Sequence, residues 1–211
     1  MKVIERVFER RIREKVKIDA MQFGFMPGKG ITDAIAIFTV GQMQEKYGCK
    51  GKKLYFAFVD LEKAFDRVPR EVTRWALRKA GVEEWLVKTV MAMSEGAQTV
   101  VRTTEGDSKA FNVKVGLHQG SVASPPLFVI VMEIISRELR AGLPLELLYA
   151  DDLILIKNYY TSILQDRNAM NAYTSNYSYA INGDIRFMSN SLEPAQHFFL
   201  LFFKNADLNA S

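Results

Sequence analysis

Three aspartates occupy apolar segments in which a charge needs a physical reason. Asp151 and Asp152 are adjacent in the middle of LELLYADDLILI (residues 145–156), and Asp60 lies at the carboxyl end of LYFAFVDL (residues 54–61). A buried carboxylate costs several kcal/mol unless another group pairs with it. A divalent cation is such a partner, since Mg²⁺ prefers oxygen ligands and keeps water and phosphate oxygens in its remaining positions. Two such ions, about 3.5–4 Å apart, clamp the attacking and leaving oxygens of a phosphoryl transfer.

Local geometry limits how these carboxylates could meet. Neighbouring strand residues point to opposite faces, so Asp151 and Asp152 act together only if the chain turns tightly there. Asp60 joins them only if its own strand lies beside that hairpin. The residues alone leave a second interpretation open, in which Asp151 and Asp152 form an ordinary surface turn and Asp60 caps the following helix.

The elements that must position these residues follow from hydrophobic periodicity and turn residues. The run 54–61 indicates a buried strand, and 145–156 indicates two half-strands around the ADD step. Pro69 is suited to begin a helix and Gly81 to stop it. The remaining expected elements are a charged helix over 3–16 with one apolar stripe, a helix from a Thr32 cap to about 46, helices over 69–79 and 83–94, a hairpin of 98–104 and 109–115 turning at 105–107, and a helix after Ser124.

The composition of the 211 residues permits one substantial core. The formal charge of +4 and the pI of 9.1 permit nucleic-acid binding without requiring it. Cys49 is the single cysteine, which excludes an intrachain disulfide and fits a reducing compartment. No apolar stretch approaches the roughly 20 residues of a membrane span, and residues 1–17 do not read as a secretory signal. Residues 158–211 are rich in Asn and Tyr and poor in charge, and their pattern predicts no fold.

Four motifs in one order carry a resemblance to a known family. They are QFGFMPGKGITDAI (22–35), FVDLEKAFDRVPR (58–70), GLHQGSVASPPLF (116–128) and LLYADDLIL (147–155). Over about residues 1–157 they resemble the successive motifs of reverse transcriptases of non-LTR, LINE-like retrotransposons. The resemblance implies a truncated α+β polymerase palm with an antiparallel sheet and packed helices, partial helical fingers and no thumb. It assigns residues 1–53 to the fingers, 54–157 to the palm and 158–211 to an atypical tail, disordered or frame-shifted.

The same resemblance implies a metal-binding set. Asp60, Asp151 and Asp152 would be the catalytic carboxylates, with Asp152 the less tightly bound member of the YADD turn. The carbonyl oxygen of Leu61 would add a ligand. Two Mg²⁺ ions are the expected cofactors, with Mn²⁺ as an alternative.

Three further residues gain substrate-binding roles from the resemblance. Phe65 would be the aromatic steric gate that favours deoxynucleotides; a core Phe is the alternative, and both can hold because the other face of the ring must pack. Gln119 and Gly120 lie where the family lets the backbone approach the templating base and the incoming nucleotide, since Gly removes a blocking side chain. Without the family, these two belong to a polar turn.

Basic residues near the motifs admit two interpretations. A stripe of Arg67, Arg70, Arg74 and Arg78, flanked by Lys63 and Lys79, could bind a nucleic-acid backbone or form an ordinary charged outer face. Lys29 could contact a phosphate or be a solvated loop lysine. The segment GFMPGKG lacks the spacing of a phosphate-binding loop.

These implications define a reaction and its rivals. The expected function is RNA-directed DNA polymerase activity, in which an RNA template directs addition of deoxynucleoside triphosphates to a DNA primer, without a membrane partner. The alternative is a catalytically inert retroelement fragment that binds nucleic acid nonspecifically. Ala150 and Phe65 disfavour an RNA-dependent RNA polymerase, and the palm motifs disfavour a maturase or telomerase-like relative. Localisation stays open between nucleus and cytoplasm.

Overall fold

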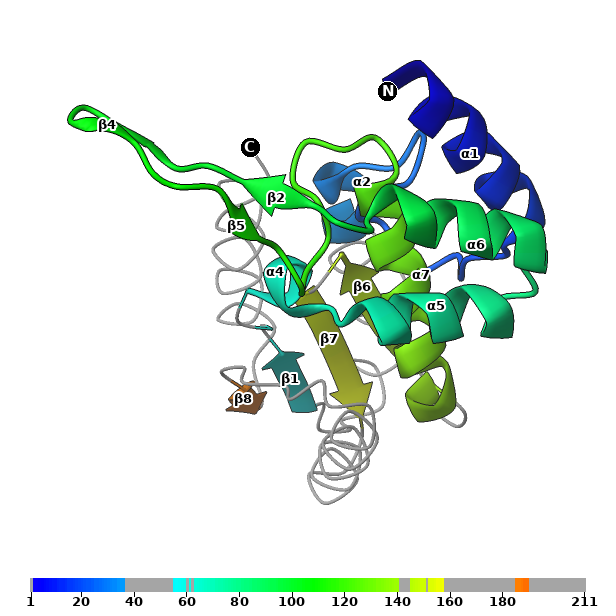
Figure 1. The fold of residues 1–211 in the computed structure, drawn as a ribbon. Coiled ribbons are helices and arrows are strands. Elements are labelled where there is room, and N and C mark those ends of the chain that lie inside the picture. Colours follow the sequence, from blue (N-terminus) through cyan, green and yellow to red (C-terminus); the bar gives the residue numbers. More distant parts are fainter. Residues whose placement is uncertain are drawn as a thin grey trace, which may run out of the picture. The chain divides into compact units, whose positions relative to one another are not determined.

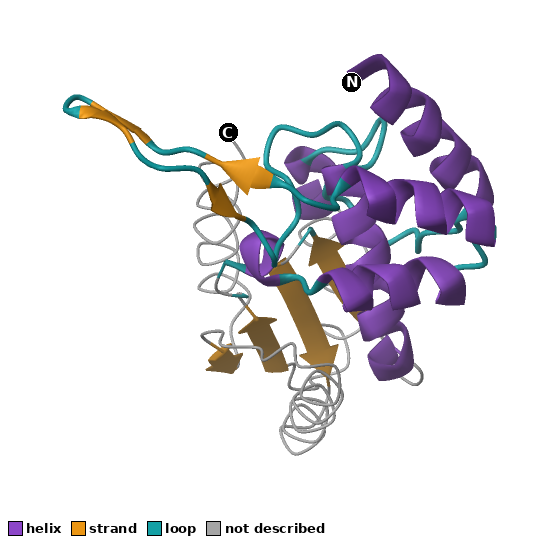
Figure 2. Ribbon diagram, viewed as in Figure 1, coloured by secondary structure: helices purple, strands orange, loops and turns teal. Residues whose placement is uncertain are grey.

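A computed structural model describes seven segments of the chain. They are residues 2–36, 55–59, 61, 63–140, 145–150, 152–157 and 185–189. They form two compact units whose segments interleave along the sequence: Met1–Lys17 with Lys63–Ile134, and Ile18–Glu62 with Ile135–Ser211. Helices and antiparallel strands occur together, so the fold is of the expected α+β class (Figure 2). No helix in the described segments combines the length and the apolar character needed to cross a membrane.

The first unit is mainly helical (Figure 1). Its helices are α1 (Lys2–Lys15), α4 (Ala64–Arg67), α5 (Arg70–Lys79), α6 (Glu84–Met93) and the larger part of α7 (Ser124–Arg140). α5 follows Pro69 and ends just before Gly81, whose φ is 81°, so the predicted start and stop signals are confirmed. α5 and α6 pack on each other, and Leu77 and Leu86 are buried.

α1 confirms the helix predicted over 3–16, but only part of its apolar stripe is buried. Ile12 is 0% exposed and Val16 is 9% exposed, whereas Val3 is 76% and Val7 is 48% exposed. The apolar stripe is therefore buried only toward the carboxyl end of the helix.

A β-ribbon extends from the first unit between α6 and α7 (Figure 1). Its antiparallel pairs are β2 (Gln98–Thr99) with β5 (Phe111–Asn112) and β3 (Arg102–Thr103) with β4 (Gly106–Asp107). The predicted hairpin is confirmed, but the predicted turn at 105–107 is wrong. Gly106 and Asp107 pair with Thr103 and Arg102, which leaves residues 104 and 105 to make the turn.

The second unit is built on a four-stranded antiparallel sheet in the order β6-β7-β1-β8 (Figure 1). The strands are β6 (Leu145–Tyr149), β7 (Asp152–Lys157), β1 (Tyr55–Val59) and β8 (Ile185–Ser189). Leu147 and Ile154 are cross-strand partners in β6 and β7, and both are 0% exposed. The strand predicted within 54–61 and the two predicted half-strands are confirmed as strands, and the burial of Leu147 and Ile154 explains why the run 145–156 is apolar.

Two details of the second unit differ from the sequence-based expectation. β8 belongs to the tail whose composition predicts no fold, yet it pairs with β1 along the whole of that strand. α2 occupies Ile31–Ala36, so Thr32 lies inside the helix and the prediction that it caps the helix is wrong. The Gly30 N–H instead donates a 2.7 Å hydrogen bond to Oδ2 of Asp33. The rest of the predicted helix, residues 37–46, lies outside the described residues.

Candidate active site

The hairpin of β6 and β7 provides the tight turn that the ADD step requires. Tyr149 pairs with Asp152, so only positions 150 and 151 separate the two strands. Ala150 has a φ of 56°, in the left-handed region that non-glycine residues seldom adopt. Asp152 is the first residue of β7 and is 6% exposed. The tight turn that was required at the ADD step is confirmed at the described positions 150 and 152.

β1 lies directly beside that hairpin. Val59, the last residue of β1, pairs with Leu153, the residue after Asp152, and the two strands are antiparallel. The carboxyl end of β1 therefore meets the amino end of β7, which confirms the predicted neighbourhood of strand and hairpin. Leu61 follows β1 and is 4% exposed. Asp60 and Asp151 themselves lie outside the described residues.

One alternative for the aspartates, Asp60 as a helix cap, can be weighed. The helix after the first motif, α4, has Lys63 at its N-cap position, so the interpretation that Asp60 caps this helix is wrong. Among the described residues, no group of three or more His, Cys, Asp or Glu side chains could hold a metal ion. That set contains only Asp152 of the three predicted carboxylates.

Phe65 belongs to the first unit, where α4 carries it. Its ring lies 5.4 Å from the ring of Phe128 in α7, with an interplanar angle of 41°. Phe128 is fully buried, whereas Phe65 is half-buried. One side of the Phe65 ring is thus used in packing, as the core interpretation requires, and the ring keeps some exposed surface.

The loop of the third motif is bonded to the same helical turn. Gly116 N–H donates to the Val68 carbonyl (3.0 Å), and Leu117 N–H donates to the Phe65 carbonyl (3.1 Å). Nε2 of Gln119 donates a 2.7 Å hydrogen bond to Oδ1 of Asp66, on the exposed surface. Gly120 has a φ of 80°, and a Cβ there would meet no atom within 4 Å. Phe65 and Gln119 are therefore brought together in one unit, while Leu61 and Asp152 belong to the other.

Glu5 of α1 supports this loop, although no motif includes it. Its Oε2 accepts hydrogen bonds from the Ser121 hydroxyl (2.9 Å) and from the Val122 N–H (2.8 Å). The Ser121 hydroxyl oxygen in turn accepts from the Ala123 N–H (3.2 Å), next to the start of α7. A partner more than a hundred residues away could not be found from local spacing.

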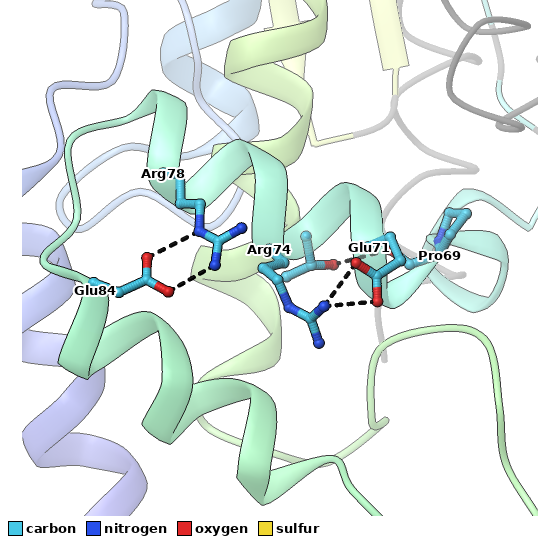
Figure 3. A network of polar contacts seen from close by, with 6 residues as sticks. Pro69, Glu71, Arg74, Arg78 and Glu84 are labelled. Carbon is cyan, nitrogen blue, oxygen red and sulfur yellow. Dashed lines mark hydrogen bonds and ion pairs between the residues drawn. The ribbon is translucent and has the colours of Figure 1, made fainter.

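Two arginines of the stripe, Arg74 and Arg78 on α5, form ion pairs within the protein (Figure 3). Arg74 pairs with Glu71 at 2.8 Å, and Arg78 pairs with Glu84 of α6 at 2.6 Å. Arg70 donates to the Val113 carbonyl. These contacts favour the charged outer face over a stripe free to bind a nucleic-acid backbone.

Two glutamates at the start of α6 have shifted pKa values. The hydrogen bonds from Arg78 hold the pKa of Glu84 below its ordinary value, and they raise the pKa of Arg78. For Glu83, the Trp85 indole N–H and then Lys15 lower the pKa of the carboxyl. All these groups are exposed, so they belong to the surface of the first unit.

Lys29 is held locally. Its Nζ donates to the carbonyl oxygens of Ala20 and Gln22, the latter at 3.1 Å, and lies 4.8 Å from the centroid of the Phe23 ring. The side chain is half-buried. These contacts do not fit the interpretation of Lys29 as a freely solvated loop lysine.

The order of the motifs on this fold agrees with a match to a known family. A family model described as reverse transcriptase (RNA-dependent DNA polymerase) matches residues 1–189. The chain belongs to the reverse transcriptase family. The match reaches beyond residue 157, where the motif resemblance ends, and includes β8.

Curated relatives of this reverse transcriptase chain come from retrotransposons, which confirms the predicted resemblance. The chain is 26% identical over 159 residues to the retrovirus-related Pol polyprotein of the type-1 retrotransposable element R2 of Nasonia vitripennis, covering 72% of this chain and 15% of that protein. It is 28% identical over 172 residues to the putative 115 kDa protein in the type-1 retrotransposable element R1DM of Drosophila melanogaster, covering 80% and 16%. The chain thus spans about a sixth of the length of these relatives.

Solved structures share the fold. A telomerase from Candida tropicalis, determined in complex with a TWJ fragment of telomeric RNA, superposes with a TM-score of 0.64 at 14% identity. The superposition covers 90% of this chain and 33% of the telomerase. A telomerase from Candida albicans gives a TM-score of 0.58 at 13% identity, covering 90% and 34%. The reverse transcriptase chain therefore has the α+β fold of a polymerase of this family, whose members use nucleic-acid templates and divalent metal ions.

Proposed function

We propose that the chain carries the palm of an RNA-directed DNA polymerase, which extends a DNA primer on an RNA template with deoxynucleoside triphosphates. One observation carries the proposal beyond family membership. Val59 pairs with Leu153, and Tyr149 pairs with Asp152, so β1 ends beside the turn of the β6–β7 hairpin. In the sequence, Asp60 follows the last residue of β1, and Asp151 is the second of the two positions between β6 and β7. Asp152 is the first residue of β7.

The proposed metal ligands are Asp60, Asp151, Asp152 and the Leu61 carbonyl oxygen. The donor set fits the ion, because it consists only of carboxylate and carbonyl oxygens, the ligands that Mg²⁺ prefers. Asp152 is only 6% exposed, as a ligand of an enclosed metal ion would be. Two Mg²⁺ ions, or Mn²⁺, would supply charge neutralisation at the attacking 3′-oxygen and at the leaving pyrophosphate.

The chain's own residues would orient the substrates. Phe65, braced by Phe128, would present its free surface to the sugar of the incoming nucleotide and exclude a 2′-hydroxyl. Gln119 and Gly120 would lie against the base pair being formed, on a loop that Asp66 and Glu5 hold in place. Orientation of this kind accounts for a large part of the barrier reduction in phosphoryl transfer.

The proposed division of the chain follows the motifs. Residues 1–53 would be a partial, helical fingers region, residues 54–157 the palm, and residues 158–211 an atypical tail. β8, inside that tail, extends the proposed palm sheet by one strand.

A second candidate function is nonspecific nucleic-acid binding without catalysis. The formal charge of +4 and the pI of 9.1 are compatible with it, because a basic chain can bind the phosphate backbone whether or not catalysis follows. Binding that falls steeply with salt, with no nucleotide incorporated, would support it.

Extension of a labelled DNA primer on an RNA template, with Mg²⁺ and deoxynucleotides, tests the proposal. Asp151→Asn is the matched control, because it removes a proposed ligand and keeps the size of the side chain. Extension by the parent chain and none by the variant would support the polymerase function. Absence of extension and equal Mg²⁺ affinity in both chains would exclude the proposed metal centre.

A further inference from the structure

A short segment before α2 is bonded to the end of β6. Met21 O accepts a 3.0 Å hydrogen bond from the Leu148 N–H, and the Phe23 N–H donates a 2.8 Å hydrogen bond to the Leu148 carbonyl. Gln22 and Leu148 form a parallel bridge. Residues 21–23 therefore run alongside β6 just before the turn that leads to Asp151 and Asp152, and both partners belong to the second unit.

The side chain of Gln22 is directed at that turn. It is 1% exposed, and its Oε1 accepts two backbone hydrogen bonds, from Ala150 N–H at 3.0 Å and from Gly24 N–H at 2.9 Å. Ala150 is 5% exposed and has a φ of 56°. A non-glycine residue stays in this conformation only when its surroundings impose it, and a buried N–H requires an acceptor. Gln22 supplies that acceptor.

The backbone of Gly24 lies directly against the backbone of Ala150. A Cβ at Gly24 would lie 2.2 Å from Ala150 N and 2.9 Å from its Cα. Such a distance is far below van der Waals contact, so only glycine permits this approach. The turn at Ala150 is thus held by one side-chain oxygen and by one backbone that lies against it.

We propose that Gln22 is a positioning residue for the YADD turn, which fixes the Ala150 backbone and through it the direction of the carboxylates that follow. The inference rests on the proposed function, because the groups it positions are the proposed metal ligands. A displacement of about 1 Å in a reacting group can cost about a hundredfold in rate, so a turn with a strained residue needs such a brace. A purely structural glutamine would satisfy the same N–H without affecting metal affinity.

The test uses the full chain and three variants. Gln22→Met keeps the length of the side chain but leaves only a weak acceptor, and Gln22→Glu keeps an acceptor oxygen in the same place. Gln98→Met is the matched control, since Gln98 is exposed on the β-ribbon and its amide bonds to Asn112 at 3.0 Å. The two measurements are amide hydrogen exchange at Ala150 and Gly24, and Mn²⁺ affinity by electron paramagnetic resonance.

The proposal predicts a coupled change. In Gln22→Met, exchange at Ala150 should become at least about tenfold faster, and the Mn²⁺ dissociation constant should rise about fivefold or more. Gln22→Glu should restore slow exchange at Ala150 and bind Mn²⁺ at least as tightly as Gln22→Met, and Gln98→Met should match the parent chain in both. If Gln22→Met does not fold, Gln22→Asn takes its place, because its shorter side chain cannot reach the Ala150 N–H.

Three results would overturn it, and they are distinguishable. Unchanged exchange at Ala150 in a folded Met or Asn variant would show that the hydrogen bond does not hold the turn. Faster exchange with unchanged Mn²⁺ affinity would leave Gln22 a structural residue only. A parent chain that binds no Mn²⁺ would remove the metal centre itself, and this failure of the proposed function is seen before any Gln22 variant is measured.

Discussion

At the scale of single residues, Gly116 is the position where the loop of the third motif tolerates no side chain. Its φ is 88°, and a Cβ would lie 2.5 Å from the carbonyl oxygen of Asp66. Gly116→Ala should therefore combine left-handed strain with a backbone clash and lower the free energy of unfolding by at least about 2 kcal/mol. Urea denaturation followed by circular dichroism measures the change.

Gly81→Ala separates the left-handed strain from the backbone clash, the two causes of the destabilisation expected for Gly116→Ala. Gly81 has a φ of 81°, but a Cβ there would meet no atom within 4 Å, so the cost should be near the strain alone, about 1 kcal/mol. Equal losses in the two variants would contradict the close approach of Gly116 to Asp66.

The role of a residue could be predicted only where it follows from the residue's own type and not from a partner far away in the sequence. The packing face of Phe65 follows from the size of the ring, and Phe128 occupies it. Gln22 is a polar residue in a loop motif, and nothing in its neighbourhood along the chain indicates an acceptor for Ala150, which is 128 positions away. Glu5 is similar, because α1 reads as an ordinary charged helix and its contact with Ser121 arises only from tertiary folding.

At the scale of elements, the contact between α5 and α6 should depend on pH through Glu84. The folded state lowers the pKa of Glu84 because Arg78 donates two hydrogen bonds to it. The pair therefore stabilises the fold above the ordinary glutamate pKa of roughly 4.3, and the stabilisation is lost as the pH falls through the lowered pKa. Glu84→Gln should unfold at lower urea concentration than the parent chain at pH 7, and the gap should narrow as the pH falls below the ordinary glutamate pKa.

Glu95→Gln provides the comparison for this pH effect. Glu95 lies in the turn after α6, at the other end of this helix from Glu84, and is exposed, so its substitution changes the net charge by the same amount. A gap for Glu84→Gln that persists unchanged at pH 3, or one that Glu95→Gln reproduces, would show that the Arg78 contact is not the cause.

Helices and strands with a clear hydrophobic pattern could be predicted from the sequence, whereas the positions of their ends could not be predicted as well. Apolar runs with β-branched and aromatic residues marked β1, β6 and β7, and in β6 and β7 successive residues such as Leu147 and Leu148 are buried on both faces. The turn of the ribbon was misplaced because Gly106 and Asp107 are common turn residues, whereas here they pair with Thr103 and Arg102. Threonine is a common helix cap, which is why the sequence favours Thr32 as the cap of α2. In the structure, the side chain of Asp33 accepts the hydrogen bond from the Gly30 N–H at the start of this helix.

At the scale of the whole molecule, the strand order could not be read from the sequence. The sheet order β6-β7-β1-β8 joins segments from residues 55–59, 145–157 and 185–189, and pairing between distant strands leaves no local signal. β8 was missed for a further reason, since the composition of the tail resembles that of a chain without a core. The family match to residue 189 ends where β8 ends, which supports its place in the fold.

The contribution of β8 to the sheet leads to a last prediction, tested by comparing chains of two lengths. β1 has β7 on one side and β8 on the other. A chain ending at Lys157 should expose one edge of YFAFV, an uncharged strand without proline, so half of the β1 amides should lose protection from hydrogen exchange and the protein should aggregate more readily.

A chain ending at Ser189 is the matched control, because it keeps β8 and removes only the 22 residues beyond the family match, 190–211. It should protect the β1 amides as the full chain does. Equal exchange in all three chains would mean that β1 is an edge strand in solution and that residues 185–189 do not belong to the sheet. Loss of protection in both shortened chains would instead assign the protection of that edge to residues 190–211.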